Sequence, residues 1–109
     1  MTDLLLIHAN YTLFKRYKKV CEESADFAED GDETCTKHLA WMCDTILDNL
    51  YAYPIDKQSR WLGYVQGCLT MRGLINVTTE REFSRPLFHA SYIYNGEQVP
   101  PTLDRKDED

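Results

Sequence analysis

The sequence lacks the short motifs that mark the commonest nucleotide-binding and hydrolytic sites. It contains no GxxxxGK[ST] loop, no GxGxxG turn and no GxSxG around a serine. The carboxylate pairs Glu22/Glu23 and Glu80/Glu82 stand in polar stretches of sequence, which do not favour acid–base catalysis. We therefore expect a protein that is not an enzyme and that needs no cofactor.

Cysteines at zinc-binding spacing are missing as well. The chain has 4 cysteines, at positions 21, 35, 43 and 68, and no CxxC pair among them. Cys35 and His38 supply only half of a structural zinc site, so we predict no metal. Most of the cysteines fall on apolar helix stripes, which predicts buried, reduced thiols rather than disulfides.

Long apolar runs and an excess of basic charge are also absent. The run Leu4–Ile7 is too short for a membrane span or a secretory signal. With 12 basic and 18 acidic side chains, the net charge is −6. That charge disfavours sequence-independent contact with phosphate backbones. We expect a cytoplasmic protein with neither a membrane nor a nucleic acid as its direct partner.

The sequence does contain helix patterns in abundance. Apolar residues at three- and four-residue spacing predict helices over 3–28, 33–52 and 56–73, with shorter helical stretches from Thr79 to Asn95–Gly96. The prediction is an all-α bundle of four to five helices over residues 1–96, followed by a flexible acidic tail over 97–109. A chain this small buries a limited core, so a homodimer would stabilise it.

The stretch 56–73 has the clearest helix boundaries. Asp56 is expected to cap its start, and Gly73 to end it in the left-handed conformation. Gly63 and Gly67 lie inside the helix and cost it about 1 kcal/mol each relative to alanine. We expect close approach of another helix at the glycines, with Trp61 on the apolar face, which would make this the central helix.

The stretch after Thr79 contains an obstacle to a continuous helix. Thr79 and Glu82 fit a capping box, which predicts a short helical turn over 80–84. Pro86 lacks an N–H and disfavours a helix interior. We therefore predict a break, with a new helix capped by Ser84.

The strongest charge feature is an acidic run without a basic residue. It comprises Glu22, Glu23, Asp26, Glu29, Asp30, Asp32 and Glu33. One interpretation is a solvated face and loop. The other is a negative stripe, partly helical, that engages a basic groove on another protein by imitating the charge spacing of a nucleic acid.

A second group of residues favours anion binding. Arg60, Arg81, Arg85 and His89 could converge on an anionic ligand beside an aromatic wall. The alternative is that Arg81 and Arg85 pair with neighbouring acids and hold a helix junction together.

Two segments carry a resemblance to known proteins. RWLGYVQG (60–67) and EREFSRPLFH (80–89) resemble the pattern R-W-[LI]-G-[FY]-[VI]-Q-G followed by E-R-x-x-[ST]-R-P-x-F-H, found in small accessory proteins of tailed bacteriophages. The resemblance covers about residues 56–93 and implies a phage product that acts in the bacterial host cytoplasm, without assigning a catalytic role.

This resemblance sets the functional expectation. We expect a non-enzymatic phage accessory protein that binds a host bacterial protein, such as a defence, transcription or nucleic-acid-processing factor, through the acidic run. The first alternative is a small-molecule or nucleotide-binding protein using the Arg/His group. The second is a structural homo-oligomer of the virion.

Overall fold

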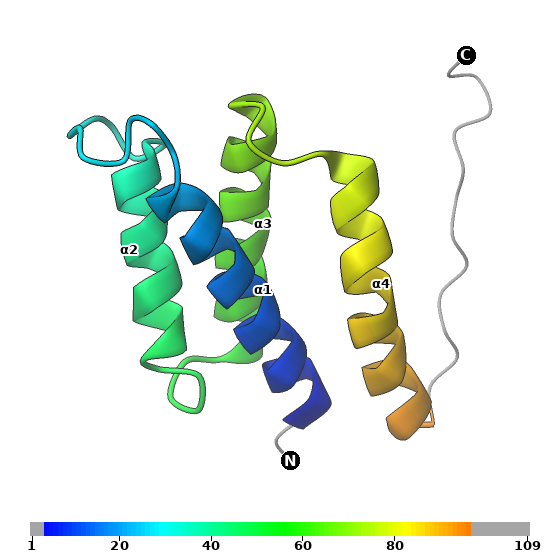
Figure 1. Cartoon of the computed structure of the whole chain (residues 1–109). Coiled ribbons are helices and arrows are strands. Elements are labelled where there is room, and N and C mark those ends of the chain that lie inside the picture. The colour runs from blue at the N-terminus through cyan, green and yellow to red at the C-terminus, as the bar shows by residue number, and fades with distance from the viewer. Residues whose placement is uncertain (1–3, 97–109) are drawn as a thin grey trace.

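The computed structural model describes residues 4–96, and within them the chain forms four helices and no strand (Figure 1). They are α1 (Leu4–Glu22), α2 (Thr36–Leu47), α3 (Ile55–Met71) and α4 (Val77–Tyr94). The all-α prediction is confirmed. The predicted tail, 97–109, lies outside the described residues.

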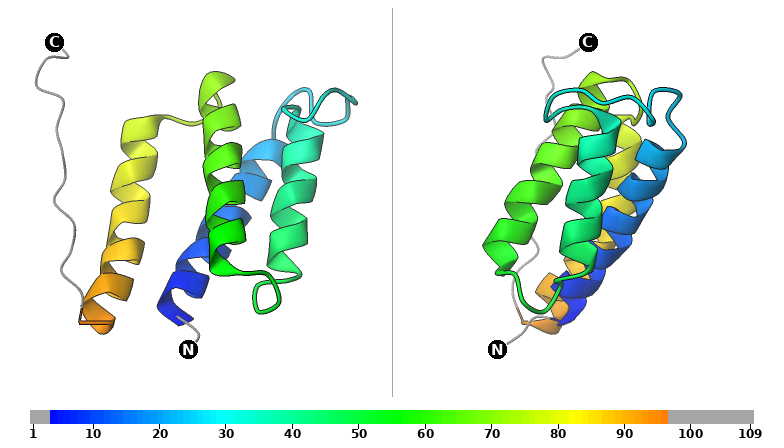
Figure 2. Two further views of the ribbon diagram at one scale, coloured as in Figure 1. Left: turned by 180° about the vertical axis from the view of Figure 1, so that it is seen from behind. Right: turned by 90° about the vertical axis from the view of Figure 1, so that its left-hand side faces the viewer.

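The first helix, α1, is the centre of the molecule. It packs against each of the other three helices and runs obliquely across them (Figures 1 and 2). Its stripe of Leu13, Phe14, Tyr17 and Cys21 is completely buried. The main partners of this stripe in the core are Leu39, Cys43 and Ile46 of α2 and Leu62, Val65 and Leu69 of α3. The expectation that α3 is central is therefore wrong.

The two glycines of α3 face outward. Gly63 and Gly67 are exposed, and a Cβ atom added to either would meet no neighbouring atom within 4 Å. The expected close approach is absent within this chain, because α3 turns Leu62, Val65 and Leu69 toward the core instead. Gly73 does follow the end of α3 with a φ of +73°, as predicted.

Two predicted helices are shorter than expected. The first ends at Glu22 instead of residue 28, because the acidic residues that follow Cys21 give a helix no apolar face to bury. The second begins at Thr36 and ends at Leu47. Its N-cap is Cys35, whose Sγ accepts a hydrogen bond from the His38 N–H at 3.4 Å.

The last helix, α4, is continuous through Pro86, so the predicted break is wrong. The cap is Asn76, whose Oδ1 accepts from the Thr79 N–H at 3.1 Å. Pro86 leaves the carbonyl of Glu82 without its usual helical donor, but both residues are exposed, where water can satisfy that oxygen. The predicted end is confirmed, with Gly96 at a φ of +71°.

A buried polar network ties α1 to α3 and α4. The Arg16 guanidinium donates from Nε and Nη2 to the two carboxylate oxygens of Glu80, at 2.8 and 3.0 Å, and stacks 3.9 Å from the ring centre of Phe83. The Tyr17 hydroxyl accepts from Gln66 Nε2 at 3.0 Å. The hydrogen bonds from Arg16 lower the pKa of Glu80. Burial acts in the opposite direction, and Tyr17 lowers this pKa further. Burial is the main cause that raises the pKa of Tyr17 to about 12.

A second buried network fixes the connection between α2 and α3. Gln58 Nε2 donates to the carbonyls of Leu50 and Tyr53, at 2.9 and 3.0 Å, and Gln58 Oε1 accepts from Asn10 Nδ2 of α1 at 3.0 Å. Both amide side chains are almost completely buried. These hydrogen bonds hold the turn between α2 and α3 against α1, beside the apolar contacts of Leu50 and Tyr53.

We expect Gly63→Ala and Gly67→Ala each to raise the free energy of unfolding by about 1 kcal/mol, because each removes a helix-interior glycine without causing a clash. Urea denaturation of the two variants measures the change. As a control, Gly73→Ala should destabilise, because its positive φ strains any other residue. A loss of stability at position 63 or 67 would show that another surface covers these glycines.

We expect Arg16→Met to lower the free energy of unfolding by about 2 kcal/mol, since it strands a buried carboxylate. The expected loss of stability is smaller than for a fully buried ion pair, because 34% of the Arg16 side chain stays exposed. The folded-state pKa of Glu80 lies below its ordinary value of 4.5, so the stabilisation is present above that pH and is lost as the pH falls through the folded-state pKa.

Denaturation at neutral and acidic pH tests this expectation. The difference in the free energy of unfolding between the native chain and Arg16→Met should become smaller as the pH falls below about 4.5. Glu80→Gln in the Arg16→Met background removes the titrating group and serves as the control. A difference that stays constant with pH would mean that the ion pair does not contribute to stability.

Candidate functional site

The structure distributes the acidic run over several parts of the surface. Glu22 lines a hollow between α1 and α2, beside Asp44 and Asp48. Glu23 lines another, beside Arg16 and Asn76 at the start of α4. The run beyond Glu22 is loop, so it does not form the helical array of carboxylates that one interpretation of the sequence required.

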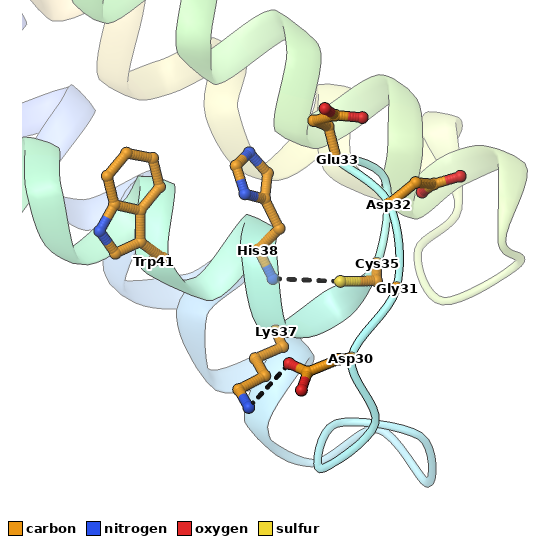
Figure 3. A pocket seen from close by; sticks show the side chains of 8 residues that line it. All are labelled: Asp30, Gly31, Asp32, Glu33, Cys35, Lys37, His38 and Trp41. Atoms are coloured by element: carbon orange, nitrogen blue, oxygen red, sulfur yellow. Dashed lines mark hydrogen bonds and ion pairs between the residues drawn. The ribbon is translucent and has the colours of Figure 1, made fainter.

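Three of the seven acids, Asp30, Asp32 and Glu33, gather at one hollow of about 370 Å³ where the loop meets the start of α2 (Figure 3). His38 and Trp41 project from α2 on the same side of this hollow. Asp30 is 2.9 Å from the Lys37 ammonium group, which leaves the hollow with a net negative charge.

The loop that carries these acids is anchored from inside by Asp26. Its carboxylate accepts from the hydroxyls of Ser24 and Thr36 and from Arg72 Nη1 at 3.1 Å. The two hydroxyls, more than Arg72, lower the pKa of Asp26. Arg72 Nε also donates to the Thr34 carbonyl at 2.7 Å. Asp26 therefore joins the loop to α2 and to the end of α3.

Two further contacts shape the loop at the hollow itself. The Tyr64 hydroxyl of α3 donates to the Glu33 carbonyl at 2.8 Å. Asp32 accepts from both the N–H and the hydroxyl of Thr34, which lowers the pKa of the Asp32 carboxyl. The Glu33 carboxylate has no ion-pair partner within residues 4–96 and is exposed. The backbone is thus fixed while this carboxylate faces solvent.

A series of rings in tilted and edge-to-face contact continues the surface from α2 onto α3. Ring centres are 5.4 Å apart for His38 and Trp41, 6.0 Å for Trp41 and Trp61, and 6.5 Å for Trp61 and Tyr53. Lys57 Nζ lies 4.2 Å from the Tyr53 ring centre. Trp41 keeps 55% of its surface exposed, which is unusual for so large an apolar side chain.

We call the combined surface the acid–aromatic face, and it consists of Asp30, Asp32, Glu33, His38, Trp41 and Trp61. Sequence reasoning missed Trp41, and it considered His38 only as a metal ligand. A signal was available, because Trp41 falls outside the apolar stripe of Leu39, Met42, Cys43 and Ile46. Aromatic rings beside carboxylates attract cationic groups, because the ring faces and the carboxylates are both negative.

The Arg/His group is not brought together by any hydrogen bond or ion pair within the described residues. Arg60 lies near the start of α3, 3.8 Å from Asp56. Arg81, Arg85 and His89 follow one another at four-residue intervals on α4. Arg81 alone of the four lines the cleft between α3 and α4.

The four cysteines are free thiols, and Cys21 and Cys43 are fully buried. Burial is the main cause that raises the pKa of Cys21 to about 11 and that of Cys43 to about 12. No set of three or more His, Cys, Asp and Glu residues in the range 4–96 is arranged to hold a metal ion. None of the helices described is long and apolar enough to span a membrane.

The site and fold just described have no counterpart in the comparisons. No protein-family model, no curated protein and no solved structure matches this chain. The molecule is therefore characterised by its own features, a four-helix fold with an acid–aromatic face across α2 and α3.

We expect Arg72→Gln to loosen the loop over residues 23–35, because it removes the contacts to Asp26 and Thr34. Backbone amides there should exchange with deuterium about three- to tenfold faster, as measured by mass spectrometry. Arg60→Gln, the same change elsewhere on α3, should leave this loop unaffected. Unchanged exchange in Arg72→Gln would mean that the loop is held by other contacts.

Proposed function

We propose that this chain is a non-enzymatic accessory protein that binds and modulates a host bacterial protein through its acid–aromatic face. The setting follows from the resemblance of residues 56–93 to tailed-phage proteins, which implies action in the host cytoplasm. The target would be a defence, transcription or nucleic-acid-processing factor.

The observation that carries the proposal is Trp41, more than half exposed beside two further rings and three carboxylates. Tryptophan and tyrosine are enriched among the residues that supply most of the energy of protein–protein binding. Burial of such a ring under a partner removes apolar surface from water and so stabilises the complex, whereas the ring stays exposed in the isolated chain. The exposed ring therefore supports a binding role over a purely solvated surface.

The rigidity of the face supports the same function. Asp26, Arg72 and Tyr64 tie the loop to α3, so the carboxylates are largely placed before a partner arrives. A preorganised surface loses less conformational entropy on binding. This distinguishes the face from a mobile acidic loop of the same composition.

The charge indicates the chemistry of the partner. An arginine side chain can stack on Trp41 while its guanidinium pairs with Glu33 or Asp32. The net charge of −6 would also speed the encounter with a basic surface. We therefore propose a basic partner with an exposed arginine, and we assign the contacts to Asp30, Asp32 and Glu33 rather than to the whole acidic run.

We expect the tagged chain to capture one stoichiometric, salt-sensitive basic protein from bacterial lysate, identified by mass spectrometry. Binding of that purified protein, measured by calorimetry, should weaken about 30-fold in Trp41→Ala. Asp32→Lys with Glu33→Lys should abolish it. All three side chains are exposed, and circular dichroism would verify that the helices persist when Asp32 loses its contacts to Thr34.

A matched control separates a specific face from general attraction. Glu22→Lys with Glu29→Lys makes the same change in charge away from the hollow and should lower affinity only slightly. An equal loss in both double variants would contradict the proposed site. Recovery of the chain alone, with concentration-dependent self-association, would contradict host binding and favour the homodimer or virion alternative.

A further inference from the structure

A second surface feature lies on the other side of α3, where that helix faces α4. The two helices and the loop between them enclose a cleft of about 470 Å³. Its walls are mainly apolar and include Leu62, Met71, Ile75, Val77 and Phe88. Met71 is 87% exposed at the edge of the cleft, so apolar surface there is left uncovered by the chain itself.

The cleft exists because α1, and not direct contact between α3 and α4, holds these helices in place. Tyr17 of α1 bonds Gln66 on α3, and Arg16 bonds Glu80 on α4. Gln66 and Glu80 both belong to the lining. Gly67, also in the lining, has no side chain to fill the space, and a Cβ atom there would meet nothing within 4 Å.

The charges of the lining favour an anion. Glu80 is the acid of the lining, and its two oxygens are occupied by Arg16 at 2.8 and 3.0 Å. Arg81 takes part in no ion pair within residues 4–96, and the Ser84 hydroxyl lies in the same lining. An apolar cleft thus carries one uncompensated cation, in a chain whose net charge is −6.

We propose that this cleft binds a small amphipathic anion, an acyl chain that ends in a carboxylate. The chain would lie against the apolar walls and the carboxylate would pair with Arg81. The volume falls within the range of about 300–1,000 Å³ typical of small-molecule sites, which are apolar with few placed polar groups. The single cation selects a single-headed anion. This site is independent of the acid–aromatic face.

Two ligands with the same chain and opposite head groups test the proposal. Decanoate and decyltrimethylammonium are titrated below their micelle concentrations and followed by amide chemical shifts in NMR. We expect saturable, one-to-one binding of decanoate, with shifts centred on residues 62–88, and about tenfold weaker binding of the cation. Decanoate should also raise the melting temperature.

Two variants and one control assign the contacts. Arg81→Gln should remove the preference for decanoate, whereas Arg85→Gln, the same change one helical turn further on, should retain it because Arg85 is outside the lining. Gly67→Leu adds a side chain where this cleft adjoins a neighbouring hollow and should weaken both ligands by narrowing the cleft, while the open space around Gly67 keeps the fold intact.

Several results would overturn the proposal. Equal affinity for the two ligands would show that Arg81 does not select the ligand. A preference for decanoate that persists in Arg81→Gln would show the same. Binding unaffected by Gly67→Leu would place the ligand elsewhere. Self-association of the chain that blocks decanoate binding would show that a second copy covers the cleft. Displacement of decanoate only by an apolar helical peptide would identify a protein partner instead.

Discussion

The ion pair between Arg16 and Glu80 is the interaction on which the arrangement of the helices depends. The buried residues of α4 are Glu80 and Ser91, so this helix is attached by polar contacts and by half-buried apolar residues such as Phe88. A bidentate arginine–carboxylate pair fixes direction as well as distance. Tyr17 and Gln66 extend the same network to α3. One polar network therefore links both α3 and α4 to α1.

This arrangement gives α3 two faces of opposite chemistry. Toward α2 it contributes Trp61 to a negative, aromatic surface, and toward α4 it lines an apolar cleft that carries one arginine. The backbone of α3 is common to both, and Arg72 at its end also holds the acidic loop. The two faces therefore share one helix, which α1 holds in place through Tyr17 and Gln66.

Local signals in the sequence predicted the fold class and two helix ends, but the expected caps are wrong: no side chain caps α3, where Asp56 was expected, and Asn76 rather than Thr79 caps α4. Helical periodicity gave the all-α class, and Gly73 and Gly96 marked the ends of α3 and α4 because each takes a positive φ. The glycine spacing identified a helix face but could not tell whether that face is covered, since this depends on the neighbours. Pro86 misled because the cost of a helix-interior proline depends on exposure. Asp26 and Glu80 gave no hint of their partners, which lie 46 and 64 residues away.

The distance in sequence between Arg16 and Glu80 has a consequence for the order of folding. During synthesis α1 leaves the ribosome first, and α2 can pack on it early because the two are neighbours in the chain. The guanidinium of Arg16 then has no carboxylate partner until Glu80 has been made, 64 residues later. Of the four helices, α1 is therefore the first to emerge and the last to be completely enclosed. One side of α1 stays uncovered while α2 and α3 are made, until α4 packs on it.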